Sequence, residues 1–374
     1  MYIYIMKSER IQQDIMKILS SPFLKKEDIV PILKMETKEE MEALQSLAMK
    51  VKQKEVGRVV YFRGLVEFSN VCRKNCFYCG LRKDNKAVNR FRLNEEEILH
   101  AAAFAYQNRY GSLVLQSGEN QSEEHIDFVC RIVQQIKSKF DLGITLSCGE
   151  QTEETYRRFF ESGAHRYLLR IETSSPQLYR KWHPDDRMHR FETRLNCLGV
   201  LKKIGFQVGS GSMVGVPFQT YEDIADDILF LRDMEIDMMG IGPFIEHSNT
   251  PFHQLNAYSI PQAERLDVTL RMIAVLRILL KDVNIASTTA MQALDRFGRE
   301  KGFLFGANVI MPNLTPPIYR KDYQLYENKP CLDEDATQCN NCLEVRIASV
   351  GETIGYGEWG DPLHFFRRVN SSPL

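Results

Sequence analysis

The sequence has no long hydrophobic run. None of its segments approaches the roughly 20 consecutive apolar residues that a transmembrane helix needs. The opening stretch from Met1 to Met6 is apolar for only a few residues before charged Lys7, which is too short for the core of a signal peptide. We therefore expect a protein that is neither secreted nor inserted in a membrane.

The sequence also lacks an excess of charge of either sign. Its 48 basic and 49 acidic residues give a formal net charge of −1, so no overall field would attract nucleic acid or an anionic lipid surface. Low-complexity segments are absent too. With 374 residues, 44% hydrophobic and 26% charged, the chain has the composition of a soluble globular protein, and we expect a small substrate.

Cysteine, by contrast, is plentiful. Nine cysteines without a secretory signal indicate a reducing compartment, the cytoplasm, where clustered thiols more often bind metal or do chemistry than form disulfides. Six of them fall into two groups of three. We interpret the isolated Cys130, Cys148 and Cys197 as core thiols.

Three regions follow one another along the chain. Residues 1–56 are predicted to be an N-terminal extension of two or three amphipathic helices, because Ile11, Ile15 and Ile18 share one face. Residues 57–313 alternate short β-rich runs with helical segments. Residues 314–374 form a tail rich in Pro, Tyr and Cys.

The alternating region contains eight strand candidates. They are the runs 59–68, 112–116, 143–147, 167–172, 207–213, 237–244, 284–289 and 308–311. Helix-capping residues at Asn94, Thr152 and Thr220 support the alternation. Eight strand–helix repeats predict an α/β fold, a (β/α)8 barrel of the TIM type, with reactive groups at the carboxyl ends of its strands. A doubly wound open sheet is the alternative that the same alternation allows.

Cys72, Cys76 and Cys79 directly follow the first predicted strand, in the spacing CX3CX2C. Three thiols within eight residues converge on one site. A structural zinc ion would need a fourth ligand, and the next candidate, His100, is distant in sequence. In a 4Fe-4S cluster, three thiolates would leave one iron open to a substrate.

This motif, with aromatic Tyr78 before the last cysteine and an eightfold β/α pattern around it, resembles the radical S-adenosylmethionine (SAM) superfamily. The resemblance implies an enzyme whose open iron chelates the methionine part of SAM. It also implies that the reduced cluster cleaves SAM to methionine and a 5'-deoxyadenosyl radical, while the protein positions the reactants and excludes water and oxygen.

Residues at later strand ends match superfamily positions that bind SAM. Ser117-Gly118-Glu119 resembles the motif that contacts the methionine amino group, although alone it could be a simple turn. Glu172 is expected to accept hydrogen bonds from the SAM ribose or amino group. Arg194, otherwise a surface charge, would pair with its carboxylate. The implied cofactor-binding residues are Tyr78, Ser117, Gly118, Glu119, Ser147, Glu172 and Arg194.

The tail carries the second group, Cys331, Cys339 and Cys342. An auxiliary iron-sulfur cluster, 2Fe-2S or 4Fe-4S, is the prediction for a chain already built around one cluster. Zinc completed by a distant residue such as His364 is the alternative, because CX2C is a generic metal motif.

Both cysteine groups, together with Ser117–Glu119, Arg170–Glu172, 284–289 and 311–313, resemble the HydE family of FeFe-hydrogenase maturases. The resemblance implies a role in maturing the diiron subcluster of the hydrogenase H-cluster, with a radical attack on the sulfur of a cysteine-bound iron carbonyl-cyanide complex. It implies as partners a low-potential electron donor of the ferredoxin or flavodoxin type and other hydrogenase maturases.

Such an organometallic substrate would meet soft sulfur and hydroxyl groups inside the barrel, although each of these residues could also be ordinary packing. The predicted substrate-binding residues are Thr145, Arg170, Met238, Thr288, Thr289, Met311 and Tyr323.

Three other functions remain open. The related methylornithine synthase and biotin synthase families share the barrel and the first cluster, but the former lacks the tail triad and the latter takes second-cluster ligands from barrel strands. An iron-sulfur scaffold or electron-transfer protein is the non-enzyme alternative, and it would not need eight β/α units around a cavity.

Overall fold

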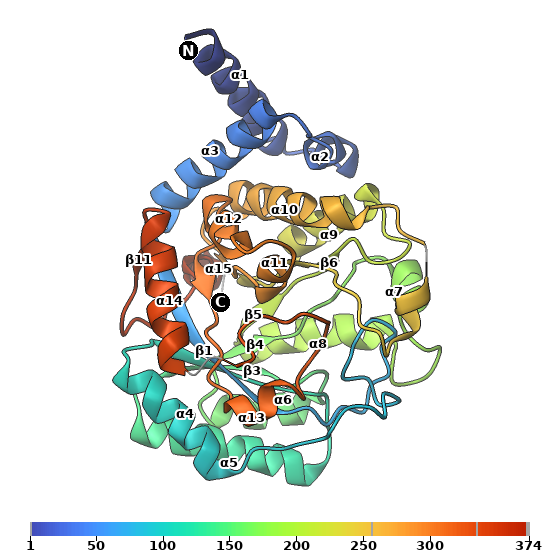
Figure 1. Cartoon of the computed structure of the whole chain (residues 1–374), viewed down its shortest axis with the longest axis vertical. Coiled ribbons are helices and arrows are strands. Elements are labelled where there is room, and N and C mark those ends of the chain that lie inside the picture. The colour runs from blue at the N-terminus through green and yellow to red at the C-terminus, as the bar shows by residue number, and fades with distance from the viewer. Residues whose placement is uncertain (1, 256, 334–335, 372–374) are drawn as a thin grey trace.

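A computed structural model describes residues 2–255, 257–333 and 336–371. Within these residues, eight parallel strands form a barrel surrounded by helices (Figure 1). A parallel bridge between Ala286 and Val309 joins the two ends of the sheet. In order around the barrel, the strands are β10 (Val309–Ile310), β1 (Val59–Ser69), β2 (Ser112–Ser117), β3 (Gly143–Ser147), β4 (Arg166–Leu168), β5 (Gln207–Ser210), β7 (Met238–Met239) and β9 (Asn284–Ile285).

Each predicted strand run overlaps one of these strands, so the predicted barrel is confirmed and the open-sheet alternative is wrong. The first half of the barrel has the longer strands. In the second half, β5 and β7 stop before Gly211 and Gly240, and the short strands β6 (Met213–Val214) and β8 (Gly242–Pro243) then pair as a separate sheet. Loops and the short paired strands β6 and β8 therefore border the carboxyl end of the barrel in its second half.

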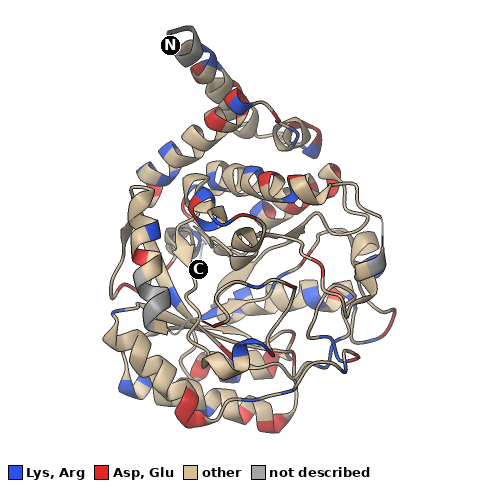
Figure 2. Cartoon of the chain, viewed as in Figure 1, with Lys and Arg blue, Asp and Glu red and all other residues tan. Residues whose placement is uncertain are grey.

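The helices that follow the strands form the outer layer, and they carry acidic and basic residues interspersed (Figure 2). The predicted caps are confirmed, because Asn94, Thr152 and Thr220 each accept a backbone amide hydrogen in the first turn of the next helix. The helices between β1 and β10 are α4 (Glu95–Gln107), α5 (Glu123–Lys139), α6 (Glu153–Glu161), α7 (Pro176–Trp182), α8 (Phe191–Ile204), α9 (Tyr221–Asp233), α10 (Arg265–Leu280), α11 (Thr289–Leu294) and α12 (Gly298–Leu304).

The N-terminal extension consists of helices, as predicted: α1 (Tyr2–Leu19), α2 (Lys26–Leu33) and α3 (Lys38–Glu55). Helix α3 packs on α10 and α2 packs on α9, while α1 extends away from the barrel (Figure 1). An ion pair of 2.9 Å between Lys26 and Asp226 joins α2 to α9. The extension thus rests on the outer helices.

The tail packs against the barrel. It contains α13 (Pro317–Arg320), α14 (Ala336–Ser349), β11 (Thr353–Ile354), which pairs with the start of β1, and α15 (Leu363–Ser371). The turn after β11 reaches the amino ends of the strands, where the Gly360 carbonyl accepts hydrogen bonds from Arg63 (3.0 Å) and Asn284 (2.7 Å). This turn covers the amino end of the barrel, so access from outside is left to the carboxyl end.

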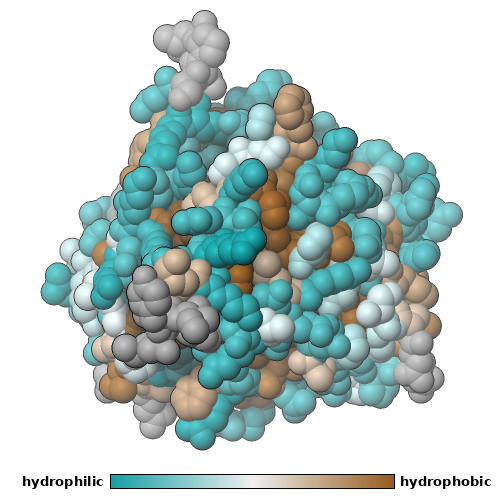
Figure 3. Space-filling model, turned by 90° about the horizontal axis from the view of Figure 1, so that it is seen from above, coloured by the Kyte–Doolittle hydropathy of each residue, from teal (hydrophilic) through white to brown (hydrophobic). Residues whose placement is uncertain are grey.

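None of the helices in the described ranges is both long and apolar enough to span a membrane. Figure 3 shows one face of the molecule, on which hydrophilic side chains cover most of the surface and hydrophobic ones lie between them.

Candidate active site at the carboxyl ends of the strands

The loop between β1 and α4 carries Cys72, Cys76 and Cys79, and all three are partly exposed. Burial raises the pKa of each thiol, that of Cys76 to about 12. Because the thiolate is the metal-binding form, these thiols need a positive charge beside them to ionise.

The three thiols suit an iron-sulfur cluster better than a single metal ion. Zinc, about 2.3 Å from each sulfur in a tetrahedral site, would draw its ligands to within about 4 Å of one another. Among the described residues, no three His, Cys, Asp or Glu side chains are arranged to hold one ion. A 4Fe-4S cluster spreads its thiolates over separate iron atoms, and three ligands leave one iron open. The donor set fits this cluster.

The chain after β2 lies directly against the cysteine loop. The Glu119 carbonyl accepts the amide hydrogen of Arg73 at 2.9 Å. A Cβ atom at Gly118 would lie 2.7 Å from the Cys72 Cβ, so the close approach of the two segments requires glycine. The predicted motif Ser117-Gly118-Glu119 is therefore adjacent to the first cysteine.

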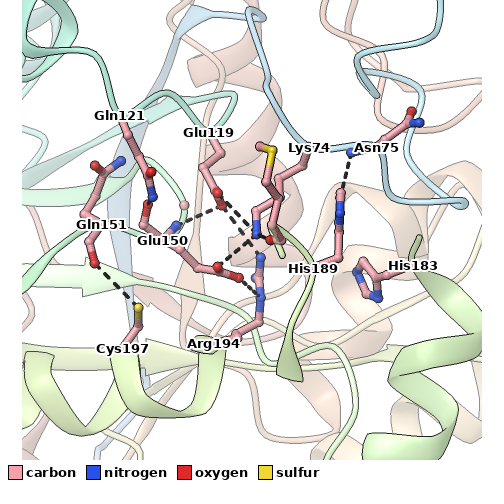
Figure 4. Close-up of polar contacts among 12 residues, drawn as sticks. Lys74, Asn75, Glu119, Gln121, Glu150, Gln151, His183, His189, Arg194 and Cys197 are labelled. Atoms are coloured by element: carbon pink, nitrogen blue, oxygen red, sulfur yellow. Dashed lines mark hydrogen bonds and ion pairs between the residues drawn. The ribbon is translucent and has the colours of Figure 1, made fainter. Parts of the chain in front are cut away.

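Four charged side chains form a buried network beside this motif (Figure 4). The Lys74 Nζ lies 2.9 Å from the Glu150 Oε2 and 3.4 Å from the Glu119 Oε1. The Arg194 Nε lies 2.8 Å from the Glu150 Oε1, and its Nη2 lies 3.8 Å from the Glu119 Oε2. Two cations and two carboxylates thus balance one another out of contact with solvent.

The structure brings the predicted Glu119 and Arg194 together, but Lys74 and Glu150 were missed from sequence. A signal existed for Glu150, because Gly149-Glu150 follows β3 as Gly118-Glu119 follows β2. Ser147, a predicted cofactor residue, ends β3 and is half-buried. Strand-end position could therefore have found Glu150.

The network shifts the charge states of its members. Burial, and next the nearby Glu150 charge, raise the pKa of Glu119 above its ordinary value. Burial is the largest single influence and opposes the charge of Arg194, but Glu150, Tyr179 and Glu119 together outweigh it and hold the pKa of Arg194 well above its ordinary value. Arg194 is therefore a permanent cation, and Glu119 is a carboxylate whose charge depends on its cationic neighbours.

Glu172 lies beyond the end of β4 in a strained conformation. Its φ of 68° is in the left-handed region, which residues other than glycine rarely adopt. Its Oε2 lies 3.2 Å from the Arg170 Nη2, yet both atoms are buried without a hydrogen-bond partner among the described residues. This oxygen has an ion pair with Arg170 but no hydrogen bond among the described residues, so it is suited to a ligand that brings a donor.

Two histidines that the sequence analysis did not single out support the cysteine loop. The His189 Nε2 accepts the Asn75 amide hydrogen at 2.8 Å, and its Nδ1 lies 2.7 Å from the Asp186 carboxylate. The Tyr78 hydroxyl lies 3.2 Å from the His183 Nε2. Burial lowers the pKa of His183 to about 3, so this ring is neutral. No metal or catalytic motif contains either histidine, which is why sequence patterns missed them.

A small cavity lies inside the barrel, lined in part by Thr145, Met238 and Met311. Its volume of about 30 Å³ is far below the roughly 300–1,000 Å³ of an ordinary ligand pocket. The Thr145 hydroxyl is buried without a hydrogen-bond partner in the described part of the chain. Three predicted substrate residues thus meet here, but this conformation has room for a compact polar group rather than a large substrate.

The other predicted substrate residues are engaged by neighbouring segments. The Thr288 hydroxyl donates to a backbone carbonyl at 3.2 Å. The Tyr326 hydroxyl donates to the Thr289 Oγ1 at 3.1 Å, and the Gln116 side-chain amide donates to the Tyr323 hydroxyl at 3.1 Å. The contacts of Thr289 and Tyr323 join the tail to the carboxyl end of the barrel, whereas that of Thr288 lies within the barrel region.

The tail cysteines are described only in part. Cys331 is half-buried with a φ of 63°, and its carbonyl accepts a hydrogen bond from Arg320 at 3.0 Å. Cys342 is exposed on α14, and the Cys339 side chain lies outside the described structure. His364, the alternative zinc ligand, lies 3.3 Å from an Asp282 oxygen.

The three isolated cysteines have the predicted surroundings. Cys148 and Cys197 are buried, and half-buried Cys130 packs against the hydrophobic core.

Residues 66–231 match the sequence model of the Radical SAM superfamily. The FeFe hydrogenase maturase subunit HydE of Thermotoga maritima is 47% identical over 328 residues, 88% of this chain and 91% of that protein. The 3-methylornithine synthase of Methanosarcina acetivorans is 27% identical over 298 residues, 79% of this chain and 81% of that protein.

Solved structures share the fold. A crystal structure of methylornithine synthase has a TM-score of 0.77 at 24% identity, covering 92% of this chain and 97% of that one. The FeFe-hydrogenase maturase HydG of Carboxydothermus hydrogenoformans has a TM-score of 0.76 at 22% identity, covering 95% and 81%. With the cysteine loop, the barrel and the 47% identity to HydE, the chain is a radical SAM enzyme and belongs to the HydE family.

Proposed function

We propose that this protein matures FeFe hydrogenase, as the name of its HydE relative states for that protein. One observation carries the proposal: 47% identity extends over 88% of the chain, so it includes both the cysteine loop and the strand ends that surround it. The radical SAM chemistry of the family is the means. What we propose is that an FeFe hydrogenase is the enzyme that this chemistry matures.

The 4Fe-4S cluster would be held by Cys72, Cys76 and Cys79. When bound, the reduced cluster and SAM together supply a 5'-deoxyadenosyl radical. The thiols of the cysteine loop are partly exposed, and the tail turn covers the opposite end of the barrel.

The SAM-binding residues follow from charge and position. The Glu119 carboxylate would accept hydrogen bonds from the amino group of SAM, and Arg194 would form an ion pair with the carboxylate of SAM. The unsatisfied Glu172 oxygen would accept a ribose hydroxyl. Backbone groups of Ser117 and Gly118, together with Ser147 and Tyr78, would complete the site.

The proposed substrate is a small organometallic compound, a cysteine-bound iron carbonyl-cyanide complex. Soft sulfur and a free hydroxyl suit such a group, and the cavity lining supplies both. Because the cavity is small in this conformation, binding would require nearby side chains to move. The substrate-binding residues we propose are Thr145, Arg170, Met238, Thr288, Thr289, Met311 and Tyr323.

Several further assignments belong to the same proposal. Cys331, Cys339 and Cys342 would hold an auxiliary cluster, either 2Fe-2S or 4Fe-4S. A low-potential ferredoxin or flavodoxin would deliver electrons, other hydrogenase maturases would share the pathway, and neither nucleic acid nor membrane takes part. The reducing cytoplasm is the proposed location. We place the boundaries of the three regions after residues 56 and 313.

Two assays test the proposal. The protein, reconstituted anaerobically with iron and sulfide, should produce 5'-deoxyadenosine from SAM and a strong reductant, and no product would leave only the cluster-scaffold alternative. It should also restore hydrogenase activity in cells that lack only their own HydE. Failure there with conversion of lysine to methylornithine would favour a methylornithine synthase-like function, and conversion of dethiobiotin to biotin would favour a biotin synthase-like one.

A further inference from the structure

Glu150 makes the two shortest ion-pair contacts in the buried network, one with Lys74 and one with Arg194 (Figure 4). Both oxygens of the Glu150 carboxylate are occupied, one by the Lys74 Nζ at 2.9 Å and the other by the Arg194 Nε at 2.8 Å. The Lys74 Nζ also donates to the Met188 carbonyl. These two side chains are thus fully engaged within the protein.

Glu119 and Arg194 each keep one polar atom that is less tightly engaged. The Glu119 Oε2 accepts the Glu150 amide hydrogen at 2.9 Å, but its Oε1 has a looser contact of 3.4 Å with Lys74. Arg194 uses its Nη1 for the Arg170 carbonyl at 2.8 Å, while its Nη2 lies 3.8 Å from Glu119, beyond hydrogen-bond distance. One acceptor and one donor of opposite charge therefore lie side by side without forming a hydrogen-bonded pair.

We infer that Lys74 and Glu150 are positioning residues that keep the 3.8 Å contact of Glu119 and Arg194 from closing into a hydrogen-bonded pair. The amino and carboxylate groups of SAM need such an acceptor and donor, so the inference rests on the proposed function. If Glu150 lost its charge, Arg194 and Lys74 would both turn to Glu119, the remaining carboxylate of the network. If Lys74 lost its charge, the excess negative charge would oppose the SAM carboxylate.

The position of Lys74 gives this pair a second effect. Lys74 lies between Cys72 and Cys76, so its buried ammonium ties the cluster-binding loop to the segment after β3. The Glu119 carbonyl holds the same loop through Arg73. The same contacts of Lys74 and Arg73 therefore fix the cluster-binding loop relative to the residues that would bind the methionine part of SAM.

The experiment compares Glu150→Gln, Lys74→Met and the double variant with the unaltered protein. Each is reconstituted anaerobically, its iron and sulfide are measured, and SAM is titrated while the EPR spectrum of the reduced cluster is recorded. Glu150→Gln should hold iron normally. Once loaded with iron, both single variants should need about tenfold more SAM, or more, for the same spectral change, since each removes a charged hydrogen bond.

The double variant separates positioning from simple charge balance. It is neutral again, so its melting temperature should recover, but Glu119 and Arg194 are then free to pair and the SAM requirement should stay high. If the double variant recovered normal SAM binding together with its stability, the inference would be overturned. Unchanged SAM titrations in both single variants would overturn it as well. If the single variants cannot hold iron, the Glu150→Asp variant is tested instead. Its shorter side chain should raise the SAM concentration required about threefold. An unchanged SAM requirement in this variant would also overturn the inference.

Lys52→Met is the matched control. Lys52 forms an equally buried ion pair of 2.8 Å with Glu352, where α3 meets the tail. Its loss should lower stability without changing the SAM titration, and a changed titration would show that any buried pair matters. If SAM leaves the spectrum of the unaltered protein unchanged, the proposed function fails rather than this inference.

Discussion

The two cysteine triads have similar sequence signals and different structural support. The first spans eight residues and the second twelve, and each contains a CX2C pair. The loop of the first is held by hydrogen bonds that its backbone amides donate to the Glu119 carbonyl and the His189 ring. In the second, Cys331 has a left-handed backbone anchored by Arg320, and Cys342 is exposed on α14.

This difference shows that the spacing of the cysteines alone does not determine whether a cluster site forms. Close spacing makes convergence of thiols possible, but a cluster site also needs a backbone that is fixed in the right shape before metal arrives. The first loop obtains this shape from the strand ends of the barrel. We expect the first triad to be indispensable for SAM cleavage and the second to contribute little to it.

The largest effect is expected from Cys76→Ala. Removal of one thiolate leaves the cluster with two protein ligands, so SAM cleavage should fall to the background of protein without iron. The measurement is 5'-deoxyadenosine formed per chain after anaerobic reconstitution. Cys130→Ala, which alters a half-buried thiol on α5, is the control and should keep normal activity. Appreciable cleavage by the Cys76 variant would remove this thiol from the cluster.

A smaller effect is expected from His189→Ala, which takes the acceptor from the Asn75 amide beside Cys76. Loss of this bond costs about 1 kcal/mol, so a chelator should remove iron roughly fivefold faster. His189→Gln, whose side-chain oxygen can accept the same hydrogen, should restore most of the retention. Equal rates in all three proteins would show that His189 does not stabilise the loop.

The sequence predicted the parts of this site that follow a periodic rule or a motif. Eight strand runs, three helix caps and the cysteine loop follow from hydrophobic alternation, capping chemistry and spacing. All are present in the predicted order, although the strands from β4 to β9 are shorter than the predicted runs. The partnership of Arg194 with Glu150 joins residues 44 positions apart, so it depends on how strands lie side by side. The left-handed turn at Glu172 likewise depends on tertiary contacts that override the preference of glutamate.

The tail can also be tested at the far end of the barrel from the cysteines. Burial opposes the charge of Asp361, but a hydrogen bond from His165 and the charge of Arg166 outweigh it and lower its pKa to about 2. A lowered pKa stabilises the fold above the unfolded value near 4, and this stability is lost as pH falls from about 4 to 2.

Asp361→Asn should therefore lower the free energy of unfolding by about 1–2 kcal/mol at pH 7, and the difference from the unaltered protein should shrink below pH 4. Chemical denaturation across this pH range measures it. SAM cleavage should stay normal, because the turn covers the end of the barrel opposite the cysteine loop. A difference that does not vary with pH would show that the Asp361 charge is not the cause.

The smallest effect on SAM cleavage is expected when Cys331, Cys339 and Cys342 are all replaced by alanine. The spectral signal of a second cluster should disappear, while 5'-deoxyadenosine formation stays within about twofold of normal, because the hydrogen bonds described for the first loop come from residues outside this triad. If cleavage were lost as well, the two triads would act together. If iron content did not change, the tail cysteines would hold no cluster, and similar spacing would have produced a metal site only where the barrel fixes the loop.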